Sequence, residues 1–236
     1  MTRAVPRSNV DAGRLLDLID AFRGRRVAVF GDLIVDEFIY GDIARVSREA
    51  PVLILNYDST QIVAGGAGNA ANNVAALGGS AVAIGVTGRD ESGARLLDAM
   101  RPRVDVRSVL TARGVRTPTK TRILAGGIHS AKQQVVRIDR GAGDGLTDAD
   151  RKAVAGRLVK AAARCDALLV SDYGSGMVTP ALVAEAHKSL RRRGGGPSPV
   201  LVDSRYALLR FRGMTTCTPN ESEVEQLFGV RIGENV

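Results

Sequence analysis

Short apolar runs alternate with amphipathic stretches of helical length along most of this 236-residue chain. The run RVAVF at residues 26–30 is β-branched and is followed by Gly31 and Asp32, which is typical of a buried strand that ends on a polar residue. Such alternation predicts an α/β fold with a doubly wound, mainly parallel sheet flanked by helices. Further strands are expected at residues 81–86, 104–109, 167–171, 199–203 and 215–217, and helices at 68–77, 91–100, 148–163, 180–192 and 221–228.

Two stretches interrupt the alternation, at approximately residues 38–57 and 119–139. In the second, KTRIL and QQVVRID alternate polar and apolar residues on either side of Gly126 and Gly127, which indicates antiparallel strands around a turn. We expect both stretches to form a small antiparallel β lid. An amphipathic helix is predicted within residues 1–24, so the chain divides into this helix and one α/β domain over residues 25–236.

The charge of the chain favours small anionic ligands over nucleic acid. Its net charge of +8 comes from 33 Lys and Arg against 25 Asp and Glu, but these are scattered arginines, and aromatic residues make up only 4%. Arg pairs well with phosphate oxygens. No apolar run approaches the roughly 18 residues of a membrane span, and the first residues lack the apolar core of a secretion signal. We therefore expect neither a nucleic-acid nor a membrane partner, and a cytoplasmic location.

The segment GGAGNAANNVAALGG at residues 65–79 has the composition of a ligand-binding floor. Gly65 and Gly66 allow the backbone to come close to a ligand, and the expected helix turns free N–H groups toward the same place. Asn69 offers both a hydrogen-bond donor and an acceptor, which suits a hydroxyl-rich ligand.

Two other interpretations of the glycine segment stay open. Gly66, Gly68 and Ala71 fit the dinucleotide pattern G-x-G-x-x-A, with Asp90 about twenty residues further on. The residues before it, 57–61, are however too polar for the core strand that this fingerprint requires. Close helix packing through small residues is the purely structural alternative.

Asp32 and Asp36 follow the first strand at a spacing that lets both face one cleft. Paired carboxylates can accept hydrogen bonds from sugar hydroxyls without any shift in pKa. The alternative is that one of them caps a turn.

Five motifs together resemble one family. GDLIVDEFIYGDIARVSREAPV, GGAGNAANNVAALGG, SDYGSGMV, LVDSR and TPNESE are similar, in this order and spacing, to the PfkB or ribokinase-like carbohydrate kinases. Within that family the nearest likeness is to the D-glycero-β-D-manno-heptose-7-phosphate kinases of lipopolysaccharide precursor synthesis. The resemblance covers the chain from about residue 26 onward. It implies a ribokinase-like fold and ATP- and Mg²⁺-dependent phosphorylation of a sugar or sugar phosphate, with heptose 7-phosphate as the best candidate.

The resemblance also implies roles for individual residues. Asn220 and Glu223 match the Asn-x-x-Glu of the family, which serves the nucleotide phosphates and Mg²⁺, with Glu223 at the metal; alternatively, Glu223 is an ordinary acidic residue in the first turn of a helix. If the substrate carries a phosphate, the lid cations are its expected partners, although they could equally be solvated strand charges. The substrate-binding residues are thus expected to be Asp32, Asp36, Gly65, Gly66, Asn69, Lys120, Arg122 and Arg137.

The chain departs from the family pattern at three places. Ser175 stands where the branch has Lys, and Ser204-Arg205 stands where it has Pro-Lys. The catalytic Asp belongs to a Gly-Ala-Gly-Asp motif that we expect beyond Val236. The GAGD at residues 141–144 lies upstream of Asn220 and is interpreted as a loop.

The missing base limits what is expected of the chain alone. The prediction is a kinase domain lacking its C-terminal part and inactive by itself. The alternatives are a non-catalytic fragment that binds a sugar or a partner through the lid, and, less favoured, an NAD-binding oxidoreductase. A homodimer through the lid is the expected assembly.

Overall fold

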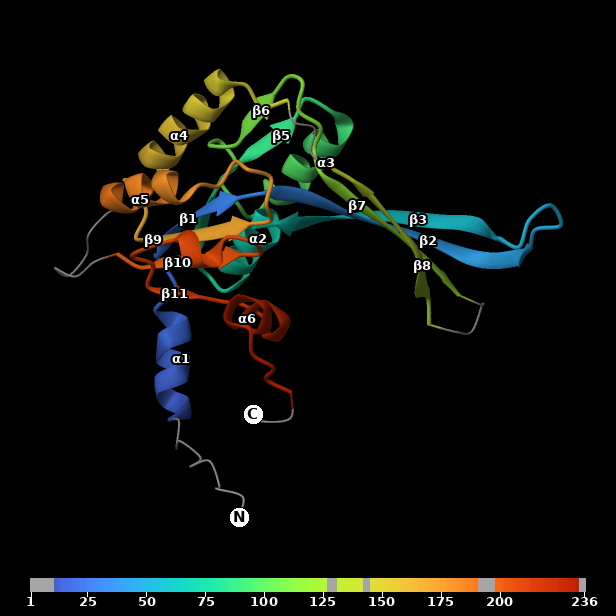
Figure 1. Cartoon of the computed structure of the whole chain (residues 1–236), viewed down its shortest axis with the longest axis horizontal. Coiled ribbons are helices and arrows are strands. Elements are labelled where there is room, and N and C mark those ends of the chain that lie inside the picture. The colour runs from blue at the N-terminus through green and yellow to red at the C-terminus, as the bar shows by residue number, and fades with distance from the viewer. Residues whose placement is uncertain (1–10, 127–130, 142–144, 191–197, 234–236) are drawn as a thin grey trace, which may run out of the picture.

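The main sheet is parallel, as the alternation of strands and helices predicted. A computed structural model describes residues 11–126, 131–141, 145–190 and 198–233. Five strands pair side by side through parallel ladders (Figure 1). In spatial order these strands are β11 (Thr216–Cys217), β10 (Val200–Ser204), β9 (Ala167–Asp172), β1 (Arg26–Gly31) and β4 (Ser80–Ile84).

Helices cover both faces of the main sheet because successive strand residues point to opposite sides. Ala28 and Phe30 of β1 pack in one core cluster with α4 (Asp148–Ala162) and α5 (Pro180–Ser189). Val29, between them, packs in a second cluster with α2 (Ala67–Ala76) and α3 (Glu91–Met100). These three side chains are 0% exposed, so β1 is the centre of a three-layer α/β domain.

A second sheet forms the lid and projects away from the body of the domain (Figure 1). Its order is β3 (Leu53–Gly66), β2 (Leu33–Val46), β7 (Thr119–Gly126) and β8 (Gln133–Arg140). Both outer pairs are antiparallel, as expected, whereas β2 and β7 pair in parallel. The strands also reach further toward the body than residues 38–57, because β2 begins directly after Asp32 and β3 runs into α2.

The strand expected at residues 104–109 is wrong. The structure has one isolated bridge there, between Val82 and Asp105, and the strand β6 (Leu110–Ala112) comes afterwards and pairs with β5 (Val86–Gly88). Val104 and Val109 are buried in the core, so the apolar pattern reports burial and not strand pairing. The helix expected to end at residue 192 ends at Ser189.

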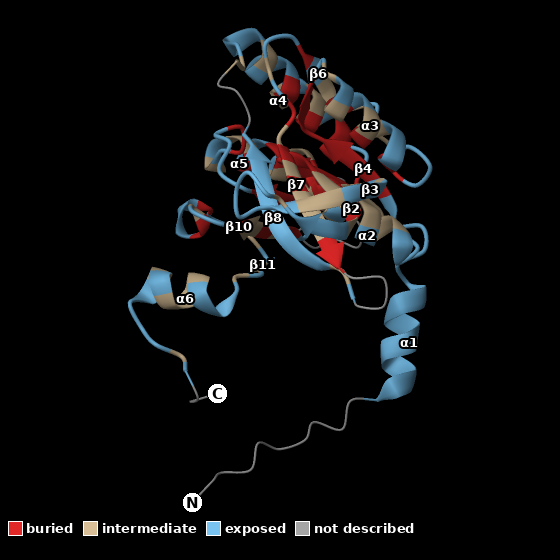
Figure 2. Cartoon of the chain, turned by 90° about the vertical axis from the view of Figure 1, so that its right-hand side faces the viewer, coloured by how far each residue is buried: buried red, intermediate tan, exposed pale blue. Residues whose placement is uncertain are grey.

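Two helices lie at the border of the domain (Figure 2). The predicted N-terminal helix is present as α1 (Ala12–Asp20), but none of its residues is buried, and Leu16 is 63% exposed. Near the other end, α6 (Glu221–Phe228) follows β11, and a short 3₁₀ turn, η1 (Leu208–Arg210), connects β10 to β11. Within the described residues, no helix is long and apolar enough to cross a membrane.

Candidate functional site

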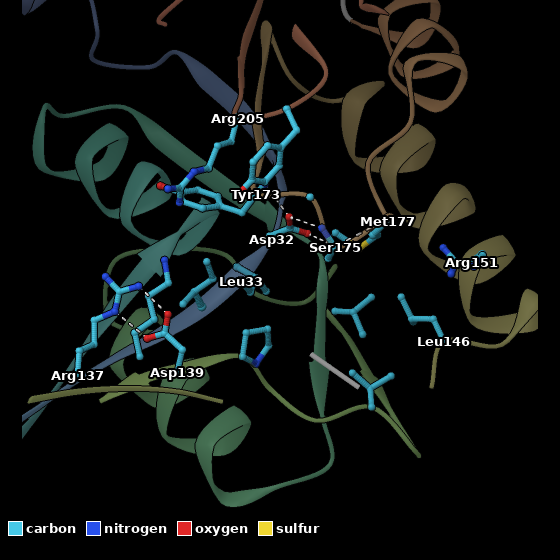
Figure 3. A pocket seen from close by; sticks show the side chains of 17 residues that line it. Asp32, Leu33, Arg137, Asp139, Leu146, Arg151, Tyr173, Ser175, Met177 and Arg205 are labelled. Carbon is cyan, nitrogen blue, oxygen red and sulfur yellow. Dashed lines mark hydrogen bonds and ion pairs between the residues drawn. The ribbon is translucent and has the colours of Figure 1, made fainter. Parts of the chain in front are cut away.

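A pocket of about 560 Å³ lies where the carboxyl ends of β1 and β9 meet the lid. This volume is in the usual range for small-molecule sites. The body contributes Asp32 and the loop after β9, and the lid contributes side chains of β2, β7 and β8 (Figure 3). The polar lining residues are Asp32, Lys120, Arg137, Asp139, Arg151, Tyr173, Ser175, Arg205 and Tyr206.

Asp32 is the most strongly anchored group of the pocket. Its side chain is nearly buried, with 5% exposure. The backbone N–H groups of Tyr173 and Ser175 donate to Oδ2 at 2.7 and 3.3 Å, and the Ser175 hydroxyl donates to Oδ1. Burial raises the pKa of Asp32, and these hydrogen bonds offset part of that rise. The result is a carboxylate held in one orientation at the pocket wall.

The paired glycines let β3 approach the functional carboxylates. Gly66 has φ of 56°, and a β-carbon there would lie 2.3 Å from the carbonyl oxygen of Asp32. A β-carbon on Gly65 would lie 2.3 Å from Oδ2 of Asp36. Glycine is therefore required at both positions by close contacts with atoms of the protein itself. Of the described residues, those that line the pocket include neither glycine, and Asn69 lies exposed on α2 outside the lining.

Asp36 and Arg122 neutralise each other on the lid. The Arg122 guanidinium donates to Asp36 at 2.6 Å and its carbon lies 5.2 Å from the ring centre of Phe38. Neither charged residue lines the pocket, although the strand register places Asp36 beside Lys120. Both lie next to the site as a support for the lid.

Lys120 and Arg137 bring positive charge from the lid into the pocket. The Lys120 ammonium lies 5.1 Å from the ring centre of Tyr173, so it bridges from β7 to the loop after β9. Arg137 on β8 makes a bidentate pair with Asp139, at 2.8 and 2.6 Å. Together with Arg151 and Arg205, four cationic side chains face two carboxylates, and this excess suits an anionic ligand.

Asn220 and Glu223 cap the N-terminus of α6. The Asn220 side chain accepts from the backbone N–H of Glu223 at 2.9 Å, and the Glu223 carboxylate accepts from that of Asn220 at 3.0 Å. Glu223 lies near Asp203, the last but one residue of β10. Burial raises the pKa of Asp203, and the Glu223 charge raises it further.

The donor set near α6 bears on metal binding. Within the described part of the chain, no group of three or more His, Cys, Asp or Glu side chains could enclose a metal ion. Mg²⁺ usually keeps several waters and needs one or two protein carboxylates beside substrate phosphates. The pair Asp203 and Glu223 fits that looser kind of binding, and a cation would relieve their mutual repulsion.

Comparison with known proteins decides the family. The model of the pfkB family carbohydrate kinases matches residues 25–235. The chain belongs to the pfkB family. Its likeness to this family, inferred above from five motifs, is thereby confirmed.

Relatives in the pfkB family match this chain over only part of their own length. It is 35% identical over 216 residues to the bifunctional protein HldE of Gluconobacter oxydans. The aligned region covers 90% of this chain and 43% of that protein. The chain thus spans less than half the length of the curated relatives it matches.

Solved structures of kinases share the fold of this pfkB chain. Phosphofructokinase-2 from Escherichia coli in complex with fructose-6-phosphate superposes with a TM-score of 0.65 at 18% identity, covering 89% of this chain and 65% of that chain. Arabidopsis thaliana ribokinase complexed with ribose and ATP gives a TM-score of 0.55 at 16% identity, covering 89% and 64%. The expected ribokinase-like fold is confirmed.

The predicted site residues of this pfkB chain fall into three groups. Asp32, Lys120 and Arg137 line the pocket. Asp36, Arg122, Gly65 and Gly66 support it from the lid. Asn69 lies outside the lining, and Asn220 and Glu223 lie together at the N-terminus of α6.

Residues that the sequence did not assign to the site come mainly from the loop after β9. Tyr173 and Ser175 stand in SDYGSG, directly after a buried strand, and Ser175 lies between Gly174, with φ of 86°, and Gly176, with φ of 79°. That glycine spacing was the available signal for a tight loop. Arg151 and Arg205 carried no such signal.

The structure tests the dinucleotide alternative but not the GAGD loop. The dinucleotide fingerprint requires a core parallel strand before its helix, but β3 belongs to the lid sheet, where its ladder with β2 is antiparallel. The loop GAGD includes residues 142–144, which lie outside the described residues.

Proposed function

We propose that the chain binds a phosphorylated sugar in the pocket between the lid and the strand ends, as the sugar-binding side of an ATP-dependent kinase. The observation that carries this proposal is the anchored Asp32 carboxylate in a pocket lined by four cationic side chains. The carboxylate accepts a hydrogen bond from a sugar hydroxyl, and the cations hold the phosphate. The best candidate substrate is heptose 7-phosphate, converted to heptose 1,7-bisphosphate.

Lys120 is the proposed first partner of the substrate phosphate. Arg122 is already paired with Asp36, and Arg137 is paired with Asp139, so their charges are partly neutralised. Lys120 instead lies over the face of Tyr173, where its ammonium keeps N–H donors for an incoming anion. The carbohydrate kinase family and the sugar-bound relatives support a sugar as the other part of the ligand.

ATP and Mg²⁺ are the proposed cofactors, with Asn220 and Glu223 as the residues that serve them. Glu223, with Asp203 near it, would hold a hydrated Mg²⁺, which would offset negative charge on the transferred phosphate. Because sugar phosphates and ATP are charged and do not cross an apolar bilayer unaided, a cytoplasmic location is part of the proposal.

Turnover requires a base that the described pocket residues do not provide. Asp32 already accepts three hydrogen bonds, which suits binding more than proton removal. The Arg137 guanidinium holds the pKa of Asp139 below its usual value, which weakens that carboxylate as a base. We therefore propose that this chain alone binds sugar without turnover, which also keeps the non-catalytic sugar-binding fragment as the second candidate function.

Calorimetry and a coupled assay separate these candidates. Titration of the chain with heptose 7-phosphate, fructose 6-phosphate and ribose is expected to show binding of at least one sugar phosphate. ADP formation from ATP and the bound sugar phosphate would establish the kinase in this chain, and binding without ADP would establish the binding fragment. The proposal is wrong if neither sugar phosphate binds at millimolar concentration. Binding of NAD in its place would favour the oxidoreductase alternative.

A second copy of the chain is the proposed partner of the lid. Apolar side chains stay exposed along the lid strands, including Val46 at 59%, Tyr57 at 68%, Val136 at 47% and Ile138 at 49%. Of the described strands, β8 pairs only with β7, so its other edge is open to a further strand. Sedimentation analysis should show a dimer that Val136→Lys converts to a monomer; a monomeric wild type would contradict this part of the proposal.

A further inference from the structure

We propose that Ser175 is a positioning residue: its hydroxyl fixes the Asp32 carboxylate so that a single acceptor position remains for a sugar hydroxyl. This inference rests on the proposed function, because it concerns how Asp32 meets its ligand. It also gives a role to Ser175, which stands where the family resemblance leads one to expect Lys.

The loop that carries Ser175 is fixed at its base. The Gly174 N–H donates to Oδ1 of Asp172 at 3.0 Å, and the Ser204 hydroxyl donates to Oδ2 of the same carboxylate at 2.7 Å. Gly174 has φ of 86°, and a β-carbon there would lie 2.8 Å from the ring of Tyr206. The loop thus has a defined shape before any ligand arrives.

The Ser175 hydroxyl has a defined direction within this loop. It accepts from the backbone N–H of Met177 at 3.3 Å and donates to Oδ1 of Asp32. A hydroxyl has one proton, and here that proton is committed to Asp32. Removal of the hydroxyl would free both the Met177 N–H and one side of the carboxylate.

The loop after β9 affects ligand choice because its donors occupy acceptor positions on the Asp32 carboxylate. A carboxylate has about four lone-pair positions. Tyr173 and Ser175 backbone donors occupy those on Oδ2, and the Ser175 hydroxyl occupies one on Oδ1. With the donors of the described residues in place, one position on Oδ1 remains, so Asp32 can hold one hydroxyl and cannot chelate two neighbouring hydroxyls.

The same hydrogen bond sets the pH range in which Asp32 can act. Burial raises the pKa of Asp32, and the Ser175 hydroxyl is the largest influence that lowers it. Binding through the carboxylate is present above this pKa and is lost as pH falls through it, so loss of the hydroxyl moves the acid limit of binding to higher pH. Among the described residues, the other charged groups around Asp32 are Asp172 beside it and Lys120, Arg137, Asp139, Arg151 and Arg205 across the pocket.

Ser175→Ala tests the inference with two measurements. Calorimetry with heptose 7-phosphate and fructose 6-phosphate from pH 4 to pH 8 should show affinity about tenfold weaker than wild type at neutral pH, with the acid limit moved upward. Titration of the Asp32 carboxyl carbon by NMR in the ligand-free chain should show a higher pKa in Ser175→Ala. Ser175→Thr keeps the hydroxyl and should restore both values.

The controls separate positioning from a general effect on folding. Ser189→Ala removes a hydroxyl that, among the described residues, donates to the backbone of its own helix, and it should change neither measurement. The inference is overturned if wild type binds a sugar phosphate and Ser175→Ala binds it equally at every pH, or if the Asp32 titration is unchanged. If wild type binds neither sugar phosphate, the proposed function itself fails, and the role of Ser175 in sugar binding falls with it.

Discussion

At the scale of single residues, Asp32 combines a cost in stability with a gain in binding. It is nearly buried and lies beside Asp172, and its raised pKa shows that the fold disfavours its charge. For an acid with a raised pKa, the stability of the fold decreases as pH rises through that pKa. A costly carboxylate with three donors aimed at it is typical of a functional position.

Asp32→Asn should therefore separate stability from binding. The uncharged amide removes the desolvation cost, so we expect a free energy of unfolding at pH 7 equal to or above that of wild type. Affinity for sugar phosphate should fall by at least about tenfold, because a hydrogen bond to a charged acceptor is lost. Urea unfolding and calorimetry measure the two quantities. A variant that binds as wild type does would contradict the assignment of Asp32.

Lys120→Met tests the proposed phosphate partner. We expect the affinity for fructose 6-phosphate to fall by about tenfold, with little change in any affinity for fructose, because only the phosphate loses its partner. Lys160→Met on the exposed side of α4 is the matched control and should leave both affinities unchanged. Equal losses for both sugars would show that Lys120 does not recognise the phosphate.

At the scale of secondary-structure elements, the parallel pairing of β1 with β9 depends on a missing side chain. A β-carbon on Gly31 would lie 2.0 Å from the carbonyl oxygen of Ser171 on β9. Gly31→Ala should lower the free energy of unfolding by about 3 kcal/mol, because backbone atoms would have to move apart. Gly156→Ala in α4, where a β-carbon meets no atom within 4 Å, should instead raise it by about 0.5–1 kcal/mol. Denaturant unfolding of both variants tests the contrast, which an equal effect would contradict.

Asp90 ties the start of α3 to the segment that enters β7. Its carboxylate accepts from the N–H of Gly93 at 2.8 Å and from the N–H and hydroxyl of Thr117 at 2.8 and 2.6 Å. Burial alone would raise its pKa, but the donors from Thr117 and Gly93 outweigh burial and lower it. A lowered pKa contributes stability above the unfolded value of 3.8, and this contribution is lost as pH falls below it.

Asp90→Asn should consequently lower the free energy of unfolding by about 2 kcal/mol at pH 7. The difference from wild type should shrink as pH falls from 5 toward 3, because protonation removes the same charge from wild type. Asp17→Asn on the exposed α1 controls for a general loss of charge. A difference that stays constant over this pH range would show that the carboxylate charge of Asp90 plays no part.

The elements themselves were largely predictable from sequence, and the exceptions have physical reasons. The core strands and helices follow hydrophobic period and capping residues, such as Thr147 before α4 and Asn220 before α6. The strand predicted at residues 104–109 is wrong because Val104 and Val109 are buried without strand pairing, which gives the same apolar pattern as a strand. The sequence correctly predicted that the lid stretches form strands. Their register and the parallel pairing of β2 with β7 depend on contacts that local patterns do not encode.

At the scale of the whole molecule, the site exists because separate parts of the chain meet. Asp32 directly follows β1, Lys120 belongs to the lid and Tyr173 to the loop after β9. The Lys120–Tyr173 contact joins lid to body. The sequence could predict Asp32 and the lid cations from type and spacing. It could not show that Arg122 is taken up by Asp36, or that Ser175 and Arg205 complete the wall, because those facts depend on tertiary arrangement.

Hydrogen exchange of the whole chain with and without heptose 7-phosphate tests the central claim most directly, because it shows where the sugar phosphate binds. The predicted result is protection in residues 31–36, 118–122 and 173–177, which hold Asp32, Lys120 and Ser175, with no change in α5 on the side away from the pocket. Protection elsewhere, or none at saturating sugar phosphate, would contradict a sugar site between the lid and the strand ends.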